Sequence, residues 1–128
     1  MFRANPLSLL PTMNREEGKG VYSVCSSNEY VIRAAMRDAV EEGYVLIVES
    51  TANQVNQYGG YTGMTPEDFV LFTTKLAEEE GLDRSHLILG GDHLGPLTWT
   101  DCCESVAMKN SEELIASYVL AGYSKIHI

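Results

Sequence analysis

The chain contains 128 residues, of which 45% are hydrophobic, so it can bury the core of one globular domain. Eighteen acidic residues against nine basic ones give a net charge of −9, which opposes binding to nucleic acid and to anionic membranes. Because the sequence shows neither a basic leader with an apolar segment nor an apolar run of membrane length, we expect a cytoplasmic protein without a membrane partner. Three cysteines, two of them adjacent and none in a CxxC motif, favour free thiols.

The first part of the chain predicts a lead-in and one strand-helix unit. Residues 1–20 contain two prolines and a polar run, so we expect at most a short helix there, before a domain over residues 21–128. Residues 21–25 form a compact strand candidate. Residues 26–29 then supply a helix N-cap with a glutamate at the capping-box position, and the apolar stripe that follows ends at Gly43, a predicted C-cap.

The second unit contains a long loop. Residues 44–48 predict a buried strand, and Pro66 at a first helical position predicts a helix that ends at Gly81. Residues 52–64 between them are rich in amides and glycines, which is typical of a functional or a disordered loop. Side chains around this loop could bind the hydroxyls of a sugar-like substrate, and the candidates are Glu49, Asn53, Gln54, Asn56 and Gln57. The alternative is a solvated loop tip that forms its own Asx turns.

The third strand leads into the first candidate site. Residues 87–89 are apolar, as in a parallel strand buried on both faces, and two glycines follow them. Asp92 and His93 are the first polar side chains after this strand, at the sheet edge where strand-helix folds build active sites. An acid and an imidazole suit a divalent metal and proton transfer, and a glycine such as Gly91 lets a ligand approach closely. The alternative is a structural pair that caps a turn.

The last part of the chain predicts two helical pieces and a fourth strand. Asp101 could cap a short piece through Met108, and Asn110 could start a second helix that ends at Gly122. In residues 125–128, Lys and His alternate with isoleucines, so they should point to the face of the sheet without helices. Lys125 there could form a Schiff base with a ketose, although an ion pair is commoner for such a lysine. The three glutamates at 78–80 predict only a solvated helix end.

Four buried strands that alternate with helices predict a parallel α/β architecture with right-handed crossovers. Four strands are half of a (β/α)8 TIM barrel, and the chain ends on a strand. We therefore expect that it supplies roughly the first four strand-helix units of such a barrel and covers only part of a larger fold.

Several blocks of sequence are distinctive enough to indicate a family. They are Tyr22–Ser26, Asn53–Gln57, Gly59–Pro66, Gly90–Pro96 and Ala121–His127. Together and in this order they resemble the accessory, non-catalytic subunit of class II tagatose-1,6-bisphosphate aldolase, from about residue 21 to residue 128. Some relatives are labelled tagatose-6-phosphate kinases, but this chain has no GxxxxGK[ST] loop.

The resemblance implies a function and a partner. It implies a TIM barrel that supports the activity and stability of a separate, zinc-dependent aldolase subunit in the catabolism of galactitol and N-acetylgalactosamine through tagatose 6-phosphate. Other relatives resemble metal-dependent 4-epimerases of ketoses or ketose phosphates that use retro-aldol chemistry. An enzyme of that kind, or an aldolase, is therefore the alternative, with a sugar phosphate as ligand. Self-association of the chain is left open.

The resemblance also implies roles for individual residues. Class II aldolases carry an Asp-His pair after the third strand, so Asp92 would be the proton donor and His93 a ligand of Zn²⁺ or Mn²⁺. They also carry a serine and an asparagine that touch substrate after the second strand, and Ser50 and Asn53 stand at comparable places. The remaining metal histidines and the phosphate-binding loops would lie beyond residue 128, so we expect the metal site of this chain to be incomplete.

Overall fold

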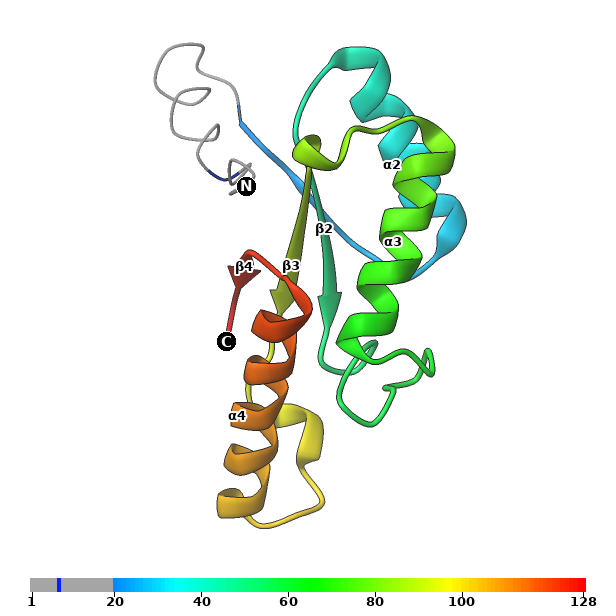
Figure 1. The fold of residues 1–128 in the computed structure, drawn as a ribbon. Coiled ribbons are helices and arrows are strands. Elements are labelled where there is room, and N and C mark those ends of the chain that lie inside the picture. The colour runs from blue at the N-terminus through cyan, green and yellow to red at the C-terminus, as the bar shows by residue number, and fades with distance from the viewer. Residues whose placement is uncertain (1–6, 8–19) are drawn as a thin grey trace.

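A computed structural model of the chain describes Leu7 and residues 20–128. The predicted lead-in over residues 1–20 therefore lies almost entirely outside the described residues. In the described part, four strands alternate with three α-helices, as predicted, and two short 3₁₀ helices flank the third strand (Figure 1). The elements are β1 (Ser23–Cys25), α2 (Glu29–Glu42), β2 (Leu46–Thr51), α3 (Pro66–Glu80), η2 (Arg84–His86), β3 (Leu87–Asp92), η3 (Pro96–Trp99), α4 (Glu104–Ala121) and β4 (Lys125–Ile126).

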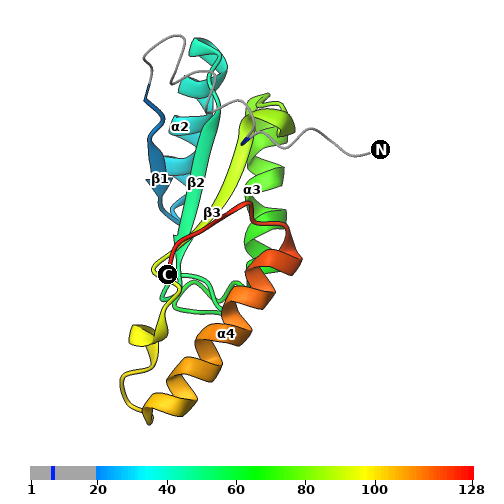
Figure 2. The same cartoon turned by 90° about the vertical axis from the view of Figure 1, so that its left-hand side faces the viewer.

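The four strands form one parallel sheet in the order β1-β2-β3-β4. Its longest pairing joins β2 to β3, with Leu46 opposite Leu87 and Thr51 opposite Asp92. Neighbours in sequence are thus neighbours in space, without the reversal of strand order that marks a doubly wound sheet. Helices α2 and α3 lie along the strands, and α4 packs beside α3 and extends past the carboxyl ends of β2 and β3 (Figures 1 and 2).

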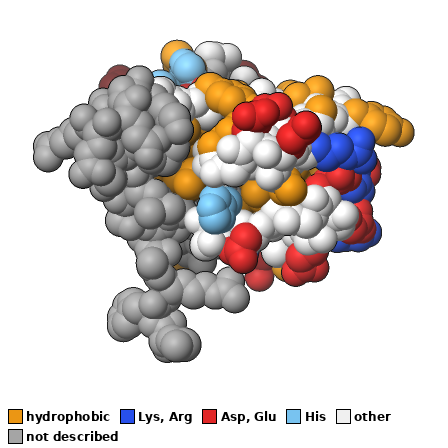
Figure 3. Space-filling view, turned by 90° about the horizontal axis from the view of Figure 1, so that it is seen from above, with side chains coloured by type: hydrophobic (Ala, Val, Ile, Leu, Met, Phe, Trp, Pro, Cys, Tyr) orange, Lys and Arg blue, Asp and Glu red, His pale blue; other side chains and the backbone are white. Residues whose placement is uncertain are grey.

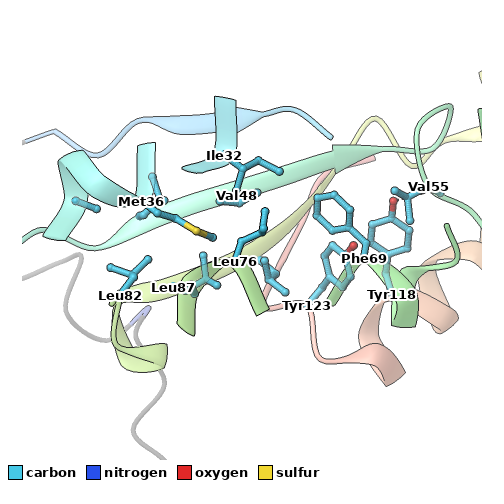
Figure 4. Packing of buried hydrophobic residues seen from close by; sticks show 14 of the residues in the cluster. Ile32, Met36, Val48, Val55, Phe69, Leu76, Leu82, Leu87, Tyr118 and Tyr123 are labelled. Atoms are coloured by element: carbon cyan, nitrogen blue, oxygen red, sulfur yellow. Dashed lines mark hydrogen bonds between the residues drawn. The ribbon is translucent and has the colours of Figure 1, made fainter. Parts of the chain in front are cut away.

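Alternate residues of the strands belong to two separate hydrophobic clusters. One cluster joins the helices to the sheet and includes Leu46, Val48, Leu87 and Leu89. Figure 4 shows part of it, where side chains from α2, α3 and α4 meet those of the strands. The residues between them, Val45, Ile47 and Ile88, form the second cluster on the other face, with Leu7 and Val21 packed against it. This division is the period-2 alternation of a strand, and it fixes which side chains face the helices.

The predicted ends of α2 and α3 are confirmed, with one difference in detail, whereas the predicted cap at Asp101 is wrong because Cys103 is the N-cap of α4. Thr65 and Asp68 form a capping box at the start of α3, and Pro66 is the first helical residue. At the start of α2, Asn28 is the N-cap and its side chain accepts from two backbone N–H groups, whereas Glu29 pairs with an arginine one turn on. The C-caps in the left-handed conformation are Gly43, Gly81 and Gly122, as expected.

The predicted break at Asn110 is wrong, because α4 is one helix of 18 residues. A capping signature stabilises a helix start by about 1 kcal/mol, whereas each large apolar side chain buried on a continuous face contributes about 1.5–3 kcal/mol. The buried face here runs through the position of the predicted break and consists of Ala107, Ser111, Leu114 and Tyr118. In addition, the Ser111 hydroxyl donates to the Leu94 carbonyl over 2.6 Å.

The glutamates at the end of α3 also differ from the prediction. Instead of being merely solvated, Glu80 accepts hydrogen bonds from Arg33 and Arg37 of α2, and Glu79 accepts one from Arg33. Figure 3 shows basic and acidic side chains next to one another on the side formed by α2 and α3. The hydrogen bonds from Arg37 and Arg33 lower the pKa of Glu80 to about 2. The network therefore ties the two helices together.

Among the described residues, no helix is both long and apolar enough to cross a membrane. All three cysteines are free, as predicted.

Candidate functional site

Polar side chains of all four strands converge at the carboxyl edge of the sheet. Val48 and Gly91 face the helices, so the residues that alternate with them point to the opposite face. Ile126 of β4 packs against the helix cluster in the same way. The side chains on the opposite face at this edge are those of Cys25, Glu49, Asp92, Lys125 and His127.

Asp92 is the centre of this group because its carboxylate contacts two imidazole rings. The Nδ1 atom of His93 lies 2.9 Å from Asp92 Oδ2, and the Nδ1 atom of His127 lies 2.6 Å from Asp92 Oδ1. The two rings meet edge to face, with centroids 5.0 Å apart. Since an ionised carboxylate can only accept, each ring donates its Nδ1–H to Asp92 and keeps a free Nε2.

The backbone around this group is held by two hydrogen bonds between the ends of β3 and β4. The N–H of His127 donates to the Gly91 carbonyl over 2.9 Å, and its carbonyl accepts from the N–H of Leu94 over 3.0 Å. Between these two contacts, His93 adopts a left-handed conformation with φ of 50°. Such a backbone is uncommon outside glycine, and it occurs here at the residue that turns its ring toward Asp92.

Burial and the neighbouring groups shift two pKa values. Burial alone would raise the pKa of Asp92, but hydrogen bonds from His93 and His127 outweigh this effect, and the net pKa lies below its ordinary value. Cys25 Sγ lies 3.9 Å from Asp92 Oδ2. Burial, followed by the nearby charges of Asp92 and Glu49, raises the pKa of the Cys25 thiol. Asp92 is therefore a carboxylate at neutral pH, and Cys25 is a thiol.

The ion-pair alternative for Lys125 is confirmed. Its ammonium contacts the carboxylate of Glu49, whose side chain is only 4% exposed, so the two charges compensate each other. A methyl group at Gly90 would lie 2.9 Å from Glu49 Cγ and 3.2 Å from Lys125 Cδ. The missing side chain at position 90 thus leaves room for the pair.

Two predicted substrate contacts lie on the helix-facing side of the sheet. The Ser50 hydroxyl is fully buried, 3.0 Å from the hydroxyl of Tyr118 and 3.2 Å from that of Tyr123. Burial raises the pKa of both tyrosines. A methyl group at Gly91 would lie 2.5 Å from Leu94 Cδ1. Ser50 and Gly91 are therefore separated by the sheet from the carboxylate of Asp92.

The amide-rich loop is ordered largely by its own side chains. Asn56 is buried, donates to the Ala52 carbonyl and accepts from the N–H of Tyr58, which is the Asx turn of the alternative prediction. Gln54 accepts from the N–H of Thr51. Gln57 donates to the Asn110 carbonyl of α4 over 2.9 Å. Among the amides named from sequence, Asn53 is the one with an exposed side chain.

His127 and Cys25 belong to the site but were not among the candidate residues predicted from sequence. The alternation in residues 125–128 was the available signal for His127, because it placed that residue on the same face as Lys125. Donor atoms of Asp92, His93 and His127 lie within 4.8 Å of one another, and so do those of Cys25, Glu49 and Asp92. Imidazole nitrogens and a carboxylate are a donor set that fits Zn²⁺ or Mn²⁺.

The chain is similar in sequence to curated proteins that carry the same name. It is 51% identical over 109 residues to the D-tagatose-1,6-bisphosphate aldolase subunits GatZ of Salmonella agona (strain SL483) and Salmonella newport (strain SL254). These alignments cover 85% of this chain but 26% of each relative, so the chain spans about a quarter of the length of the curated relatives it matches.

A solved structure shares the fold of the described part. The crystal structure of a probable tagatose 6 phosphate kinase from Sinorhizobium meliloti 1021 matches with a TM-score of 0.82 and 46% identity, over 85% of this chain and 28% of that one. Residues 7–128 also match the family described as D-tagatose-1,6-bisphosphate aldolase subunit GatZ/KbaZ-like. The resemblance found in the sequence blocks is thereby confirmed, and the chain belongs to the GatZ/KbaZ-like family of D-tagatose-1,6-bisphosphate aldolase subunits.

Proposed function

We propose that the protein acts in the cytoplasm as the accessory subunit of a class II tagatose-1,6-bisphosphate aldolase. It would bind a separate catalytic subunit and sustain its activity and stability in the catabolism of galactitol and N-acetylgalactosamine. The observation that carries this proposal is the 51% identity, over 85% of the chain, to proteins named as subunits of that aldolase.

The proposal includes a barrel. Residues 21–128 would supply the first four strand-helix units of a (β/α)8 TIM barrel. The sequential strand order and the helices packed against one face support this, because both are features of a singly wound barrel. The apolar side chains of the other face, such as Ile47 and Ile88, would then fill the barrel interior, and the group around Asp92 would lie at its catalytic rim.

The accessory role is tested by reconstitution. The catalytic subunit is purified alone and together with the whole of this protein, and cleavage of tagatose 1,6-bisphosphate is measured before and after incubation at raised temperature. We expect higher specific activity and slower inactivation in the mixture. A matched mixture with the His93→Gln variant should behave like the wild type, because a supporting surface does not require that ring.

Equal activity and equal inactivation with and without this protein would contradict the accessory role. Loss of the entire effect in the His93→Gln mixture would instead favour chemistry at this chain's own site.

The second candidate function is a metal-dependent ketose phosphate 4-epimerase or aldolase. The observation that favours it is the convergence of Asp92, His93 and His127, since a purely supporting subunit has no need for such a group. A bound Zn²⁺ or Mn²⁺ would supply Lewis-acid polarisation of a carbonyl. His93 would be a ligand, Asp92 would transfer a proton, and exposed Asn53 would contact the sugar phosphate.

Several further residues remain proposals for substrate contact in this second function. Glu49 shares the face of Asp92 and would act there together with Lys125. The other substrate-binding candidates lie in the loop or at the strand ends on the helix-facing side, and they are Ser50, Gln54, Asn56, Gln57 and Gly91.

The enzyme alternative is tested without any partner. The whole protein is incubated with Mn²⁺ or Zn²⁺ and fructose 6-phosphate, and formation of tagatose 6-phosphate is followed. Turnover that disappears in His93→Ala and persists in His86→Ala would support an enzyme. Absence of turnover in the wild type with either metal would contradict it. Borohydride trapping of a ketose in the wild type but not in Lys125→Met would be required for a Schiff base at that lysine.

A further inference from the structure

We propose that His93 and His127 together form a two-imidazole site for a divalent cation, with Asp92 as the positioning residue that orients both rings. The inference deepens the second candidate function, and its biological meaning rests on that function. The family resemblance gives the ligand role in this part of the chain to His93. His127 and the shared carboxylate are what the geometry adds.

The first step of the argument is the hydrogen bonding of the carboxylate. Each oxygen of Asp92 accepts from a different imidazole, at 2.9 Å for His93 and 2.6 Å for His127. Metal-binding histidines typically donate one ring N–H to a carboxylate, which fixes the tautomer and directs the other nitrogen to the metal. One carboxylate that holds two rings in this way prepares two Nε2 ligands at once.

The second step is the rigidity of the two backbones. Both main-chain groups of His127 are bonded to residues on either side of His93, namely Gly91 and Leu94. The ends of β3 and β4 therefore hold the two histidines at a fixed separation, and the left-handed backbone of His93 aims its ring at the shared carboxylate. A site on such paired strand ends loses little conformational freedom when an ion binds.

The third step concerns access and charge. The side chains of His93 and His127 are 73% and 50% exposed, so an ion can approach both rings from solvent. The nearby ammonium of Lys125 would repel a cation, but it is paired with Glu49. The negative charge of the Asp92 carboxylate beside the rings is therefore not offset by Lys125. Two imidazoles are a partial ligand set, and water or substrate would take the remaining positions.

The test is histidine NMR of the whole protein during titration with Zn²⁺. Long-range proton-nitrogen spectra report, for each ring, which nitrogen carries the proton and which nitrogen binds metal. The experiment is run on a Cys102→Ser, Cys103→Ser background, which removes the exposed adjacent thiols as competing zinc ligands. We expect the Nδ1–H tautomer at His93 and His127 without metal, and a joint shift of both Nε2 signals on saturation.

Variants separate ligands from the positioning residue. His127→Gln should weaken Zn²⁺ binding and abolish the shift at His93 at the same zinc concentration. Asp92→Asn should keep both rings but lower the affinity by roughly 10- to 100-fold, the range known for orienting residues around metal sites. Its amide also donates, so at least one ring should lose the Nδ1–H tautomer. His86→Gln, at the amino-terminal side of β3, is the matched control and should bind like the wild type.

Three results would overturn the inference. They are a shift of the His93 signals alone, unchanged affinity in His127→Gln, or a preserved zinc site with the tautomers unaltered in Asp92→Asn. Because the readout is metal binding rather than turnover, these results would leave the accessory function intact. Conversely, a protein that fails the aldolase and epimerase assays could still bind Zn²⁺ through both histidines, and the NMR titration would show this.

Discussion

The two faces of the sheet at its carboxyl edge differ although they are built from adjacent residues. On the helix side, the Ser50 hydroxyl hydrogen-bonds to the hydroxyls of Tyr118 and Tyr123 in a buried network. On the other side, Asp92 contacts two imidazole rings that are exposed to solvent over half or more of their surface. One face satisfies its polar groups internally, whereas the other leaves donor atoms accessible. The difference shows that side-chain direction, rather than proximity in sequence, separates structural groups from groups available for chemistry.

The largest expected effect comes from removing the Tyr118 side chain, which lies on the face of the sheet edge that the helices cover. Tyr118 is fully buried, its ring centroid lies 4.3 Å from that of Tyr123, and its hydroxyl donates to the Val55 carbonyl, so Tyr118→Ala should lower the free energy of unfolding by about 3–5 kcal/mol. His127→Ala on the open face is the control and should lower it by about 1 kcal/mol or less. Urea unfolding followed by circular dichroism measures both. Equal losses would remove the distinction between the faces.

A second pair of variants adds a methyl group to each face. At Gly91 it would lie 2.5 Å from Leu94 and 2.7 Å from the Tyr118 ring, inside a packed core, so Gly91→Ala should cost about 1–3 kcal/mol of stability. At Gly90 it would meet the side chains of Glu49 and Lys125, which can move. Gly90→Ala should therefore cost less than half as much in the same unfolding experiment. The reverse order would mean that the open face is the more rigid one.

A single hydroxyl tests whether Ser50 belongs only to the covered face. Ser50→Ala leaves the hydroxyls of Tyr118 and Tyr123 without their shared partner, so we expect a loss of about 1 kcal/mol in stability and unchanged Zn²⁺ affinity. Ser23→Ala, at an exposed position of β1, should change neither quantity. A Ser50→Ala protein of wild-type stability but with weakened substrate binding would restore the substrate contact implied by the family resemblance.

The smallest expected effect is a pH dependence of stability that comes from Glu80, a residue away from both faces of the sheet edge. Hydrogen bonds from Arg37 and Arg33 lower the pKa of Glu80 from 4.5 to about 2. These ion pairs therefore stabilise the fold fully at a pH above 4.5, and the contribution disappears as the pH falls through about 2. In Glu80→Gln, the stability between these values should depend less on pH. Thermal melting over that range measures the slope, with Glu78→Gln, exposed on the same helix, as control. A steeper slope in Glu80→Gln would contradict the assignment.

The fold was largely predictable because its signals are local and periodic. Apolar runs that end in polar residues, glycine C-caps and the proline at the start of α3 each indicate an element on their own, and all were confirmed. The break at Asn110 was predicted wrongly, since a local capping pattern competes there with a buried face that only tertiary packing creates. The closure of a barrel stays a prediction.

The candidate site was only partly predictable. Asp92 and His93 followed from their position after a buried strand, but His127 lies 35 residues from Asp92 in sequence, and its contact depends on pairing between β3 and β4. Glu49 and Ser50 were predicted to share one role, yet adjacent strand residues point to opposite faces. Sequence indicates which residues lie at an edge, and strand register decides which of them meet.

The anchoring of the amide-rich loop on α4 has a consequence for how the protein is made. The Val55 carbonyl accepts from Tyr118, and Gln57 donates to Asn110, so both anchors come from residues that are synthesised much later than the loop. During translation, residues 52–64 leave the ribosome without these partners. These two contacts of the loop can therefore form only after the growing chain has passed residue 118.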